Sequence, residues 1–199
     1  MADNITVTPG LGATVACDDV GGILWQRVKL GIGTDGSATD VSTSNPMPVI
    51  TVSKYIDVTL SLDTSVYADG DVLAETQVVA DCFRVVDGIG ILNSVMVIDE
   101  DDQGQPFDLV FLQANASLGT ENGAPSISDV NARNVMGIVR VNASDYVDLG
   151  GVRTATLSGL SLGIKAVGGT DDMYVAAISR GTGTYSASGV RLRLHVISD

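Results

Sequence analysis

Four consecutive acidic residues are the strongest chemical signal in this sequence. Asp99, Glu100, Asp101 and Asp102 lie between two apolar stretches. Carboxylates in such a run could bind a divalent cation, act as an acid/base pair, or lie in water on a turn. Each of these roles needs a different setting, so the neighbouring residues decide among them.

A calcium loop of the EF-hand type requires glycine at its sixth position and a bidentate glutamate at its twelfth. With Asp99 at the first position, Gly104 is the sixth residue but Val110 is the twelfth. No helical pattern flanks the loop, which excludes an EF-hand. A less regular calcium site that joins Asp99, Asp101 or Asp102 to another loop remains an alternative.

The residues expected of an enzyme are scarce. His195 is the only histidine, and it shares one face of an alternating segment with Arg191 and Arg193. We therefore expect a histidine at a surface or interface, not a catalytic base. A glycosidase cleft normally carries several aromatic rings, whereas the sequence contains one tryptophan. We expect no enzyme, no metal and no cofactor.

The two cysteines, Cys17 and Cys82, have no zinc or redox spacing. The start of the chain has neither a basic segment nor an apolar core, so we expect no signal peptide. Thiols in a protein without an export signal are expected to be free and reduced.

The acidic run is best interpreted as a solvated connection between two strands. Before it, Val95 and Val97 alternate with Met96 and Ile98 along a strand pattern. After it, Phe107, Leu109 and Phe111 resume the pattern. Gly104 and Pro106 supply turn chemistry between them. Exposed carboxylates there would cost little and would discourage edge-to-edge aggregation.

Strand patterns account for most of the chain after residue 54. In Tyr55–Leu62 apolar and polar residues alternate, which predicts a half-buried strand. Pairs such as Asp69-Gly70 and Gly150-Gly151 provide the positive φ angles of tight turns. Further strands are predicted in seven segments: 76–86, 90–98, 107–113, 136–142, 154–167, 173–181 and 190–198. A bulge is expected near Ser158-Gly159, where the alternation slips.

These segments predict an all-β fold: a jelly-roll-like β-sandwich over residues 55–199. We prefer a jelly roll to an immunoglobulin-like sandwich because of the strand count and the long irregular segment Ala114–Val135. A helix of one or two turns is expected within Ser126–Val135, with Ser126 as its cap.

Residues 1–54 have a different composition. They are rich in small and polar residues and contain one short strand candidate, Leu24–Leu30, and the extended Asn45–Pro48. We predict an extended N-terminal arm that gains order on a neighbour. An edge strand that folds back on its own domain is the alternative.

This N-terminal segment resembles one found near the start of many tailed-bacteriophage virion proteins. The resemblance rests on Gln26–Lys29, the loop Gly33–Ser44 and Asn45–Val49. The later stretches are similar to phage structural proteins of the β-sandwich type, including head decoration or cement proteins. The resemblance implies a virion component.

If the resemblance holds, the protein would bind the major capsid protein on the outer surface of the head, after synthesis in the host cytoplasm. We expect it to stabilise the capsid there, as a homotrimer. The arm residues expected to dock are Trp25, Arg27, Lys29, Pro46 and Pro48. Trp25 could instead fill the base of its own sandwich.

The charge of the chain limits which classes of partner are expected. A formal net charge of -13 and a pI near 4.1 disfavour nucleic acid and anionic membranes. The second functional class is a tail-associated receptor- or glycan-binding protein of the same fold. In that case the exposed loops, Ala114–Val135 and Gly181–Gly189, would carry the specificity.

Overall fold

The computed structural model describes residues 17–26, 31–32, 39–44 and 52–198. The chain divides into two units, Met1–Ile50 and Thr51–Asp199, each with its own internal contacts. The first long strand begins at Val52. Residues 52–54, which the sequence assigns to the arm, are therefore part of the sandwich.

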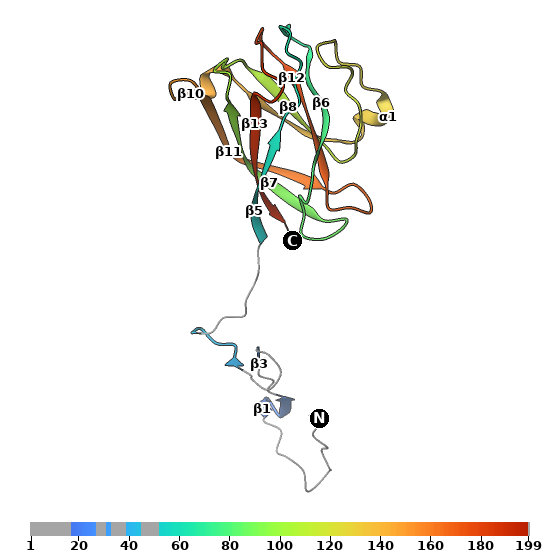
Figure 1. The fold of residues 1–199 in the computed structure, drawn as a ribbon. Helices are drawn as coiled ribbons and strands as arrows, with labels where there is room; N and C mark the ends of the chain where they lie inside the picture. The colour runs from blue at the N-terminus through green and yellow to red at the C-terminus, as the bar shows by residue number, and fades with distance from the viewer. Residues whose placement is uncertain (1–16, 27–30, 33–38, 45–51, 199) are drawn as a thin grey trace, which may run out of the picture. The chain divides into compact units, whose positions relative to one another are not determined.

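Eight long strands build the second unit (Figure 1), and the sequence predicts all eight at or near their places. A three-residue strand, a short α-helix and a 3₁₀ helix complete it. The elements are β5 (Val52–Thr59), β6 (Val72–Val79), β7 (Ile89–Asp99), β8 (Phe107–Leu112), α1 (Asp129–Ala132), β9 (Val135–Val141), η1 (Ala143–Asp145), β10 (Tyr146–Asp148), β11 (Arg153–Lys165), β12 (Met173–Ser179) and β13 (Val190–Ser198).

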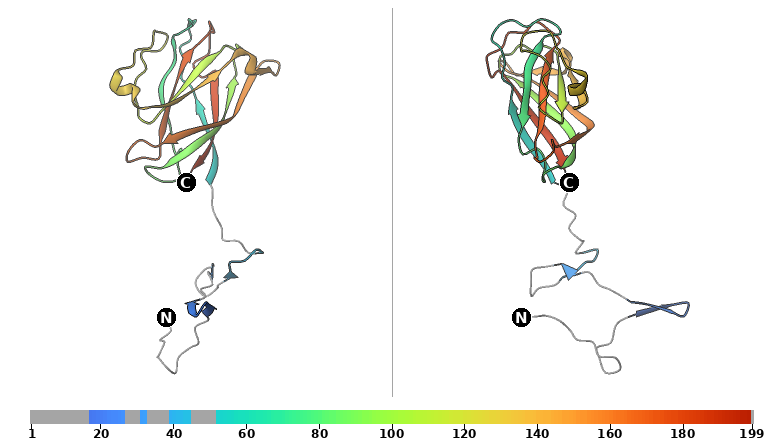
Figure 2. Two further views of the ribbon diagram at one scale, coloured as in Figure 1. Left: turned by 180° about the vertical axis from the view of Figure 1, so that it is seen from behind. Right: turned by 90° about the vertical axis from the view of Figure 1, so that its right-hand side faces the viewer.

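These strands form two antiparallel sheets, with the orders β10-β11-β7-β13-β5 and β6-β12-β8-β9. The long strands pair in nested fashion along the chain: β5 with β13, β6 with β12, β7 with β11, and β8 with β9. Nested pairing of this kind defines the two Greek keys of a jelly roll. The predicted all-β jelly-roll sandwich is confirmed, and Figure 2 shows it from behind and from the side.

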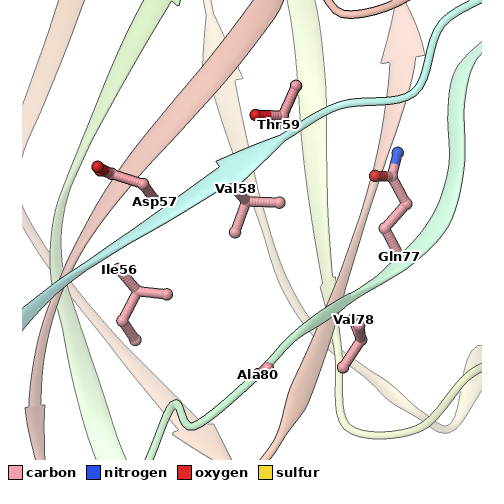
Figure 3. Close-up of a pocket in the computed structure, with 7 residues that line it drawn as sticks. All are labelled: Ile56, Asp57, Val58, Thr59, Gln77, Val78 and Ala80. Carbon is pink, nitrogen blue, oxygen red and sulfur yellow. The ribbon is translucent and has the colours of Figure 1, made fainter.

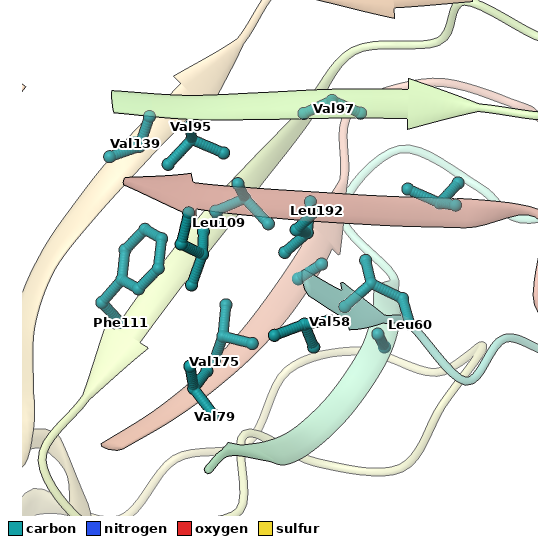
Figure 4. Packing of buried hydrophobic residues seen from close by; sticks show 14 of the residues in the cluster. Val58, Leu60, Val79, Val95, Val97, Leu109, Phe111, Val139, Val175 and Leu192 are labelled. Atoms are coloured by element: carbon teal, nitrogen blue, oxygen red, sulfur yellow. The ribbon is translucent and has the colours of Figure 1, made fainter. Parts of the chain in front are cut away.

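The core lies between the two sheets and is mainly aliphatic. On β13, Val190, Leu192, Leu194 and Val196 are fully buried, and the residues between them face outward or are half-buried. They belong to the same cluster as Leu109 and Phe111 on β8 (Figure 4). Each such side chain contributes about 1.5–3 kcal/mol to stability through burial. The apolar faces of the alternating strands therefore hold the two sheets together.

Two predicted elements need correction, and one strand is not predicted. Strand β6 ends at Val79, because Asp81 takes a left-handed φ of 50° and the buried Phe83 lies in the following connection. The cap of α1 is Ser128, not Ser126: its hydroxyl accepts from the Asn131 N–H at 3.2 Å. Strand β10 has no counterpart among the predicted strands.

The predicted bulge is present. The register between β11 and β7 shifts between Ser158 and Leu162, and Gly159 has a φ of +71°. The expected turns also adopt positive φ, at Gly70, Gly150 and Gly151.

The first unit contains two small antiparallel ladders in its described part. β1 (Cys17–Val20) and β2 (Ile23–Gln26) form a hairpin, and β3 (Gly31–Ile32) pairs with β4 (Thr39–Asp40). The strand predicted at Leu24–Leu30 corresponds in part to β2, and its residues 27–30 lie outside the described ranges. The sequence does not predict β1.

Candidate functional site

The acidic run connects β7 to β8, as the alternation predicts, but it is not simply solvated. Asp99 is only 1% exposed. Its carboxylate accepts the N–H of Gly104 at 2.6 Å and the N–H of Asp101 at 3.1 Å. Burial raises the pKa of Asp99. The prediction of a solvated run is therefore wrong for this residue, whose buried carboxylate fixes the path of the connection.

Gly104 is required in this connection for two reasons. Its φ of +61° lies in the left-handed region, and a Cβ there would come within 2.7 Å of the Arg153 side chain.

The other three carboxylates of the run point to different partners. Glu100 pairs with Arg191 at 2.8 Å, and Asp102 pairs with Arg153 at 2.7 Å. Asp101 accepts from the N–H and the hydroxyl of Ser186, at 2.7 Å and 3.0 Å.

This divergence bears on the calcium alternative. Within the described ranges, no group of three acidic, histidine or cysteine side chains is placed to hold a metal ion. In this structure the acidic run fastens the β7–β8 connection to neighbouring segments of the sandwich.

The loop Gly181–Gly189 is one of the segments so fastened. Gln105 accepts from the Thr182 N–H and Gln103 from the Thr184 N–H, each at 3.3 Å. Tyr185 is 4% exposed and belongs to the core cluster. A loop held in this way cannot readily change its conformation to fit a ligand.

The long segment Ala114–Val135 also packs on its own sheet. Ala116 and Leu118 are buried in a second cluster with Val110 and Leu112 of β8 and Ala176 of β12. This packing buries Val110 and Leu112 of β8, a strand in which every residue is buried. The part of the segment that stays exposed includes Val130 on α1, at 67%.

Asp108 on β8 holds a charged cluster that no spacing in the sequence predicts. Its side chain is 4% exposed and lies between Arg140 Nε at 2.9 Å and Arg180 Nε at 2.8 Å. The two guanidinium groups offset the burial of the carboxylate, and the pKa of Asp108 is lowered. The available signal was an acid in the otherwise apolar stretch Phe107–Leu112.

His195 lies on the outer face of β13. Its ring stacks on Tyr55 with the centroids 4.7 Å apart. Its Nε2 lies 2.6 Å from Ser53 Oγ, and its Nδ1 lies 3.1 Å from the Asn93 amide nitrogen. Because the amide must donate to Nδ1, a neutral ring carries its proton on Nε2 and donates to Ser53. That direction is the reverse of what a general base needs.

Cys82 is a free thiol, buried in the sandwich. Burial raises its pKa to about 12, so the thiolate is disfavoured. The charge of Lys54 favours the thiolate, but burial outweighs it.

The residues predicted to dock the arm fall mostly outside the described ranges. These are Arg27, Lys29, Pro46 and Pro48. Trp25 belongs to β2, where its backbone pairs with Asp18. The described part of this unit exposes Val20 and Ile23, at 63% and 61%, beside the hairpin turn. Docking by the arm therefore stays a prediction.

A groove of about 520 Å³ opens between β5 and β6, the edge strands of the two sheets (Figure 3). Two contacts bridge its ends. The Gln77 amide nitrogen donates to the Thr59 carbonyl at 3.1 Å, and its oxygen accepts from the Ser61 N–H at 2.9 Å. Lys54 Nζ donates to the Asp81 carbonyl. The groove is lined by Ile56, Asp57, Val58, Thr59, Gln77, Val78 and Ala80.

Comparison with known proteins adds little to this geometry. No protein family and no curated protein sequence matches the chain. Among solved structures, a chain of Desmodium yellow mottle tymovirus is similar at 10% identity and a TM-score of 0.27. The match covers 87% of this chain and 95% of that one. The jelly-roll assignment rests on the strand order, not on this likeness.

The described residues include no helix that is long and apolar enough to cross a membrane.

Proposed function

We propose that this protein is a structural component of a virus particle, a decoration or cement protein that binds the outside of a tailed-phage head. The observation that carries the proposal is the complete jelly roll joined to a separate N-terminal unit. Jelly rolls are a recurrent architecture of viral capsid proteins. The resemblance of the N-terminal segment to phage virion proteins points to the same role.

The polar groups of the sandwich support a mechanical role. Each carboxylate of the acidic run has a partner within the sandwich, and the loops beside it are tied down. A rigid body of this kind suits a protein that has to bear load. In the proposed mechanism, contacts with the major capsid protein add interface area across capsomer joints.

Attachment at several points would make the binding strong without any single tight contact. As a homotrimer, the protein would place three N-terminal units on neighbouring capsid subunits, and the second and third contacts would become effectively intramolecular. The net charge of -13 would keep decorated particles apart in solution.

The test is a binding assay with undecorated heads of the virus that encodes the protein. The full chain is expected to saturate the heads and to raise the temperature at which they release their DNA. A variant that lacks residues 1–50 is expected to bind far more weakly. The deletion ends at Ile50 because β5 begins at Val52, so circular dichroism should show an intact sandwich. Equal occupancy by both proteins would refute docking by the N-terminal unit.

Absence of binding by the full chain would refute the decoration role itself. The tail-associated alternative loses support at Gly181–Gly189, which is tethered by Gln103 and Gln105. In Ala114–Val135 it keeps an exposed stretch, residues 124–130. Immunogold labelling of virions would show directly whether the protein lies on the head or on the tail.

A further inference from the structure

The open side of β5 presents backbone groups without a strand partner. The Leu60 N–H donates to Val190 on β13, whereas Thr59 and Ser61 turn toward Gln77. Successive residues of a strand point their backbone groups to opposite sides. The N–H and C=O groups of Tyr55 and Asp57 therefore face the groove, and no described strand pairs with β5 on that side.

The groove has an apolar inner wall and a polar outer rim. Ile56 is partly buried and Val58 is 8% exposed, and both face the space between the sheets. Asp57 and Thr59 alternate with them and face outward, where Asp57 pairs with Arg193 at 2.7 Å. Val78, 49% exposed, lies on the opposite wall (Figure 3). An added strand would need alternating apolar and polar residues to match both surfaces.

An unpaired strand edge beside an apolar groove is the geometry of β-augmentation. An extended peptide joins the sheet through its main chain, and alternate side chains enter the groove. Proteins usually shield such edges, because an open edge pairs readily with another chain. Among the described residues, Gln77 and Lys54 shield the two ends of this edge.

The chain contains a segment with the required pattern. Ile5, Thr6, Val7 and Thr8 alternate apolar and polar, and all four are β-branched, the type that favours strands. Pro9 and Gly10 follow, which would end such a strand. Ile5 and Val7 would face the inner wall, and Thr6 and Thr8 the rim.

We propose that the β5 edge of one copy accepts residues 5–8 of a second copy as an added strand. A contact of this kind joins two different surfaces, and such head-to-tail contacts close into rings when the rotation permits. The choice of a second copy as donor rests on the proposed homotrimer, which needs a contact of this kind. The acceptor edge rests on the structure alone.

The test is photo-cross-linking in the full-length protein, without capsids. Benzoylphenylalanine replaces Val78 in the groove. The same substitution at Val147 on β10 is the control, because Val147 is 60% exposed and β10 is the edge strand farthest from β5 in the five-stranded sheet. Unlabelled and ¹⁵N-labelled proteins are mixed before irradiation. The expected product joins position 78 of one isotopic form to residues 1–10 of the other. The Val147 variant should not form it.

Two donor variants form a matched pair. Val7→Asp places a charge against the apolar wall and should abolish the cross-link. Thr8→Asp places the same charge at the rim and should preserve most of it. Equal behaviour of the two variants, a cross-link within one copy only, or no cross-link to residues 1–10 would overturn the inference.

The assay separates this inference from the proposed function. A protein that decorates heads but shows no such cross-link keeps its function and loses the strand exchange. A protein that shows the cross-link but does not bind heads exchanges strands in some other assembly.

Discussion

Asp99 and Asp108 are both almost fully buried, at 1% and 3% exposed, yet the protein holds them in opposite ways. Asp99 ends β7 and accepts hydrogen bonds from backbone N–H groups. Asp108 lies within β8 between two guanidinium groups. Burial dominates at Asp99, whose pKa is raised, whereas the arginines prevail at Asp108, whose pKa is lowered. The comparison shows that burial alone does not decide the state of a carboxylate.

The two sites also differ in what would be left behind if the carboxylate were removed. Around Asp99 the orphaned groups would be N–H donors of a tight connection, one of which forms a buried hydrogen bond. Around Asp108 they would be Arg140 and Arg180, whose side chains are 66% and 39% exposed and can reach water. Unsatisfied buried donors cost more than solvated ones, so Asp99 should matter more to stability.

The largest effect is expected for Asp99→Ala. Loss of the acceptor for the N–H groups of Asp101 and Gly104 should lower the free energy of unfolding by about 3 kcal/mol. Urea denaturation at neutral pH measures it. Asp102→Ala, in the same run but only half-buried and paired with Arg153, is the control and should cost much less. Similar losses in the two variants would show that the connection does not depend on the buried carboxylate.

A smaller loss is expected for Asp108→Ala. The cavity and the lost charge-assisted hydrogen bonds should lower the free energy of unfolding by about 2 kcal/mol. The arginines that remain can turn to water, which limits the cost. If this variant proves less stable than Asp99→Ala in the same urea titration, the proposed ranking of the two sites is wrong.

Acid should separate the two sites by the sign of their effect. The ordinary aspartate pKa is 3.8. Asp108 has a lowered folded-state pKa, so its contribution is present above that value and is lost as the pH falls through the lower folded value. Asp99 has a raised folded-state pKa, so protonation favours the folded state as the pH falls through that higher value.

Asparagine variants make this difference measurable. As the pH falls from neutrality through the ordinary aspartate value of 3.8, wild type should lose stability relative to Asp108→Asn. It should gain stability relative to Asp99→Asn over the same titration. Parallel pH profiles for the two variants would contradict the opposite shifts.

The sequence predicts the architecture well because the alternation of apolar residues is a local signal. Strand β13 follows from Val190–Ser198 alone, and the bulge in β11 follows from Ser158-Gly159. The sequence does not predict the start of β6, because Val72–Ala74, three buried residues in a row, shows no alternation. Strand β10 has only three residues and owes its pairing to β11, which no local pattern reports.

The polar sites were harder to predict because their partners come from distant segments. The acidic run looks like a solvated turn in the sequence, yet Ser186 and Arg191 lie far along the chain from it. Asp108 accepts a hydrogen bond from Arg180, which lies 72 residues away in the sequence, and no spacing rule connects the two. The open edge of β5 could not be foreseen either, because it depends on which strands pair and which do not.

The smallest expected effect sharpens the same comparison. In Arg140→Ala, Arg180 Nε still lies 2.8 Å from Asp108 Oδ2, so one guanidinium continues to offset the burial of the carboxylate. The pKa of Asp108 should then stay below its ordinary value, but by less than in wild type, and the acid-dependent loss of stability should begin at a higher pH. Carboxyl chemical shifts in a ¹³C NMR titration would follow Asp108 directly. If its pKa instead rises above the ordinary value, as at Asp99, then Arg180 alone does not hold the charge and the pair must act together.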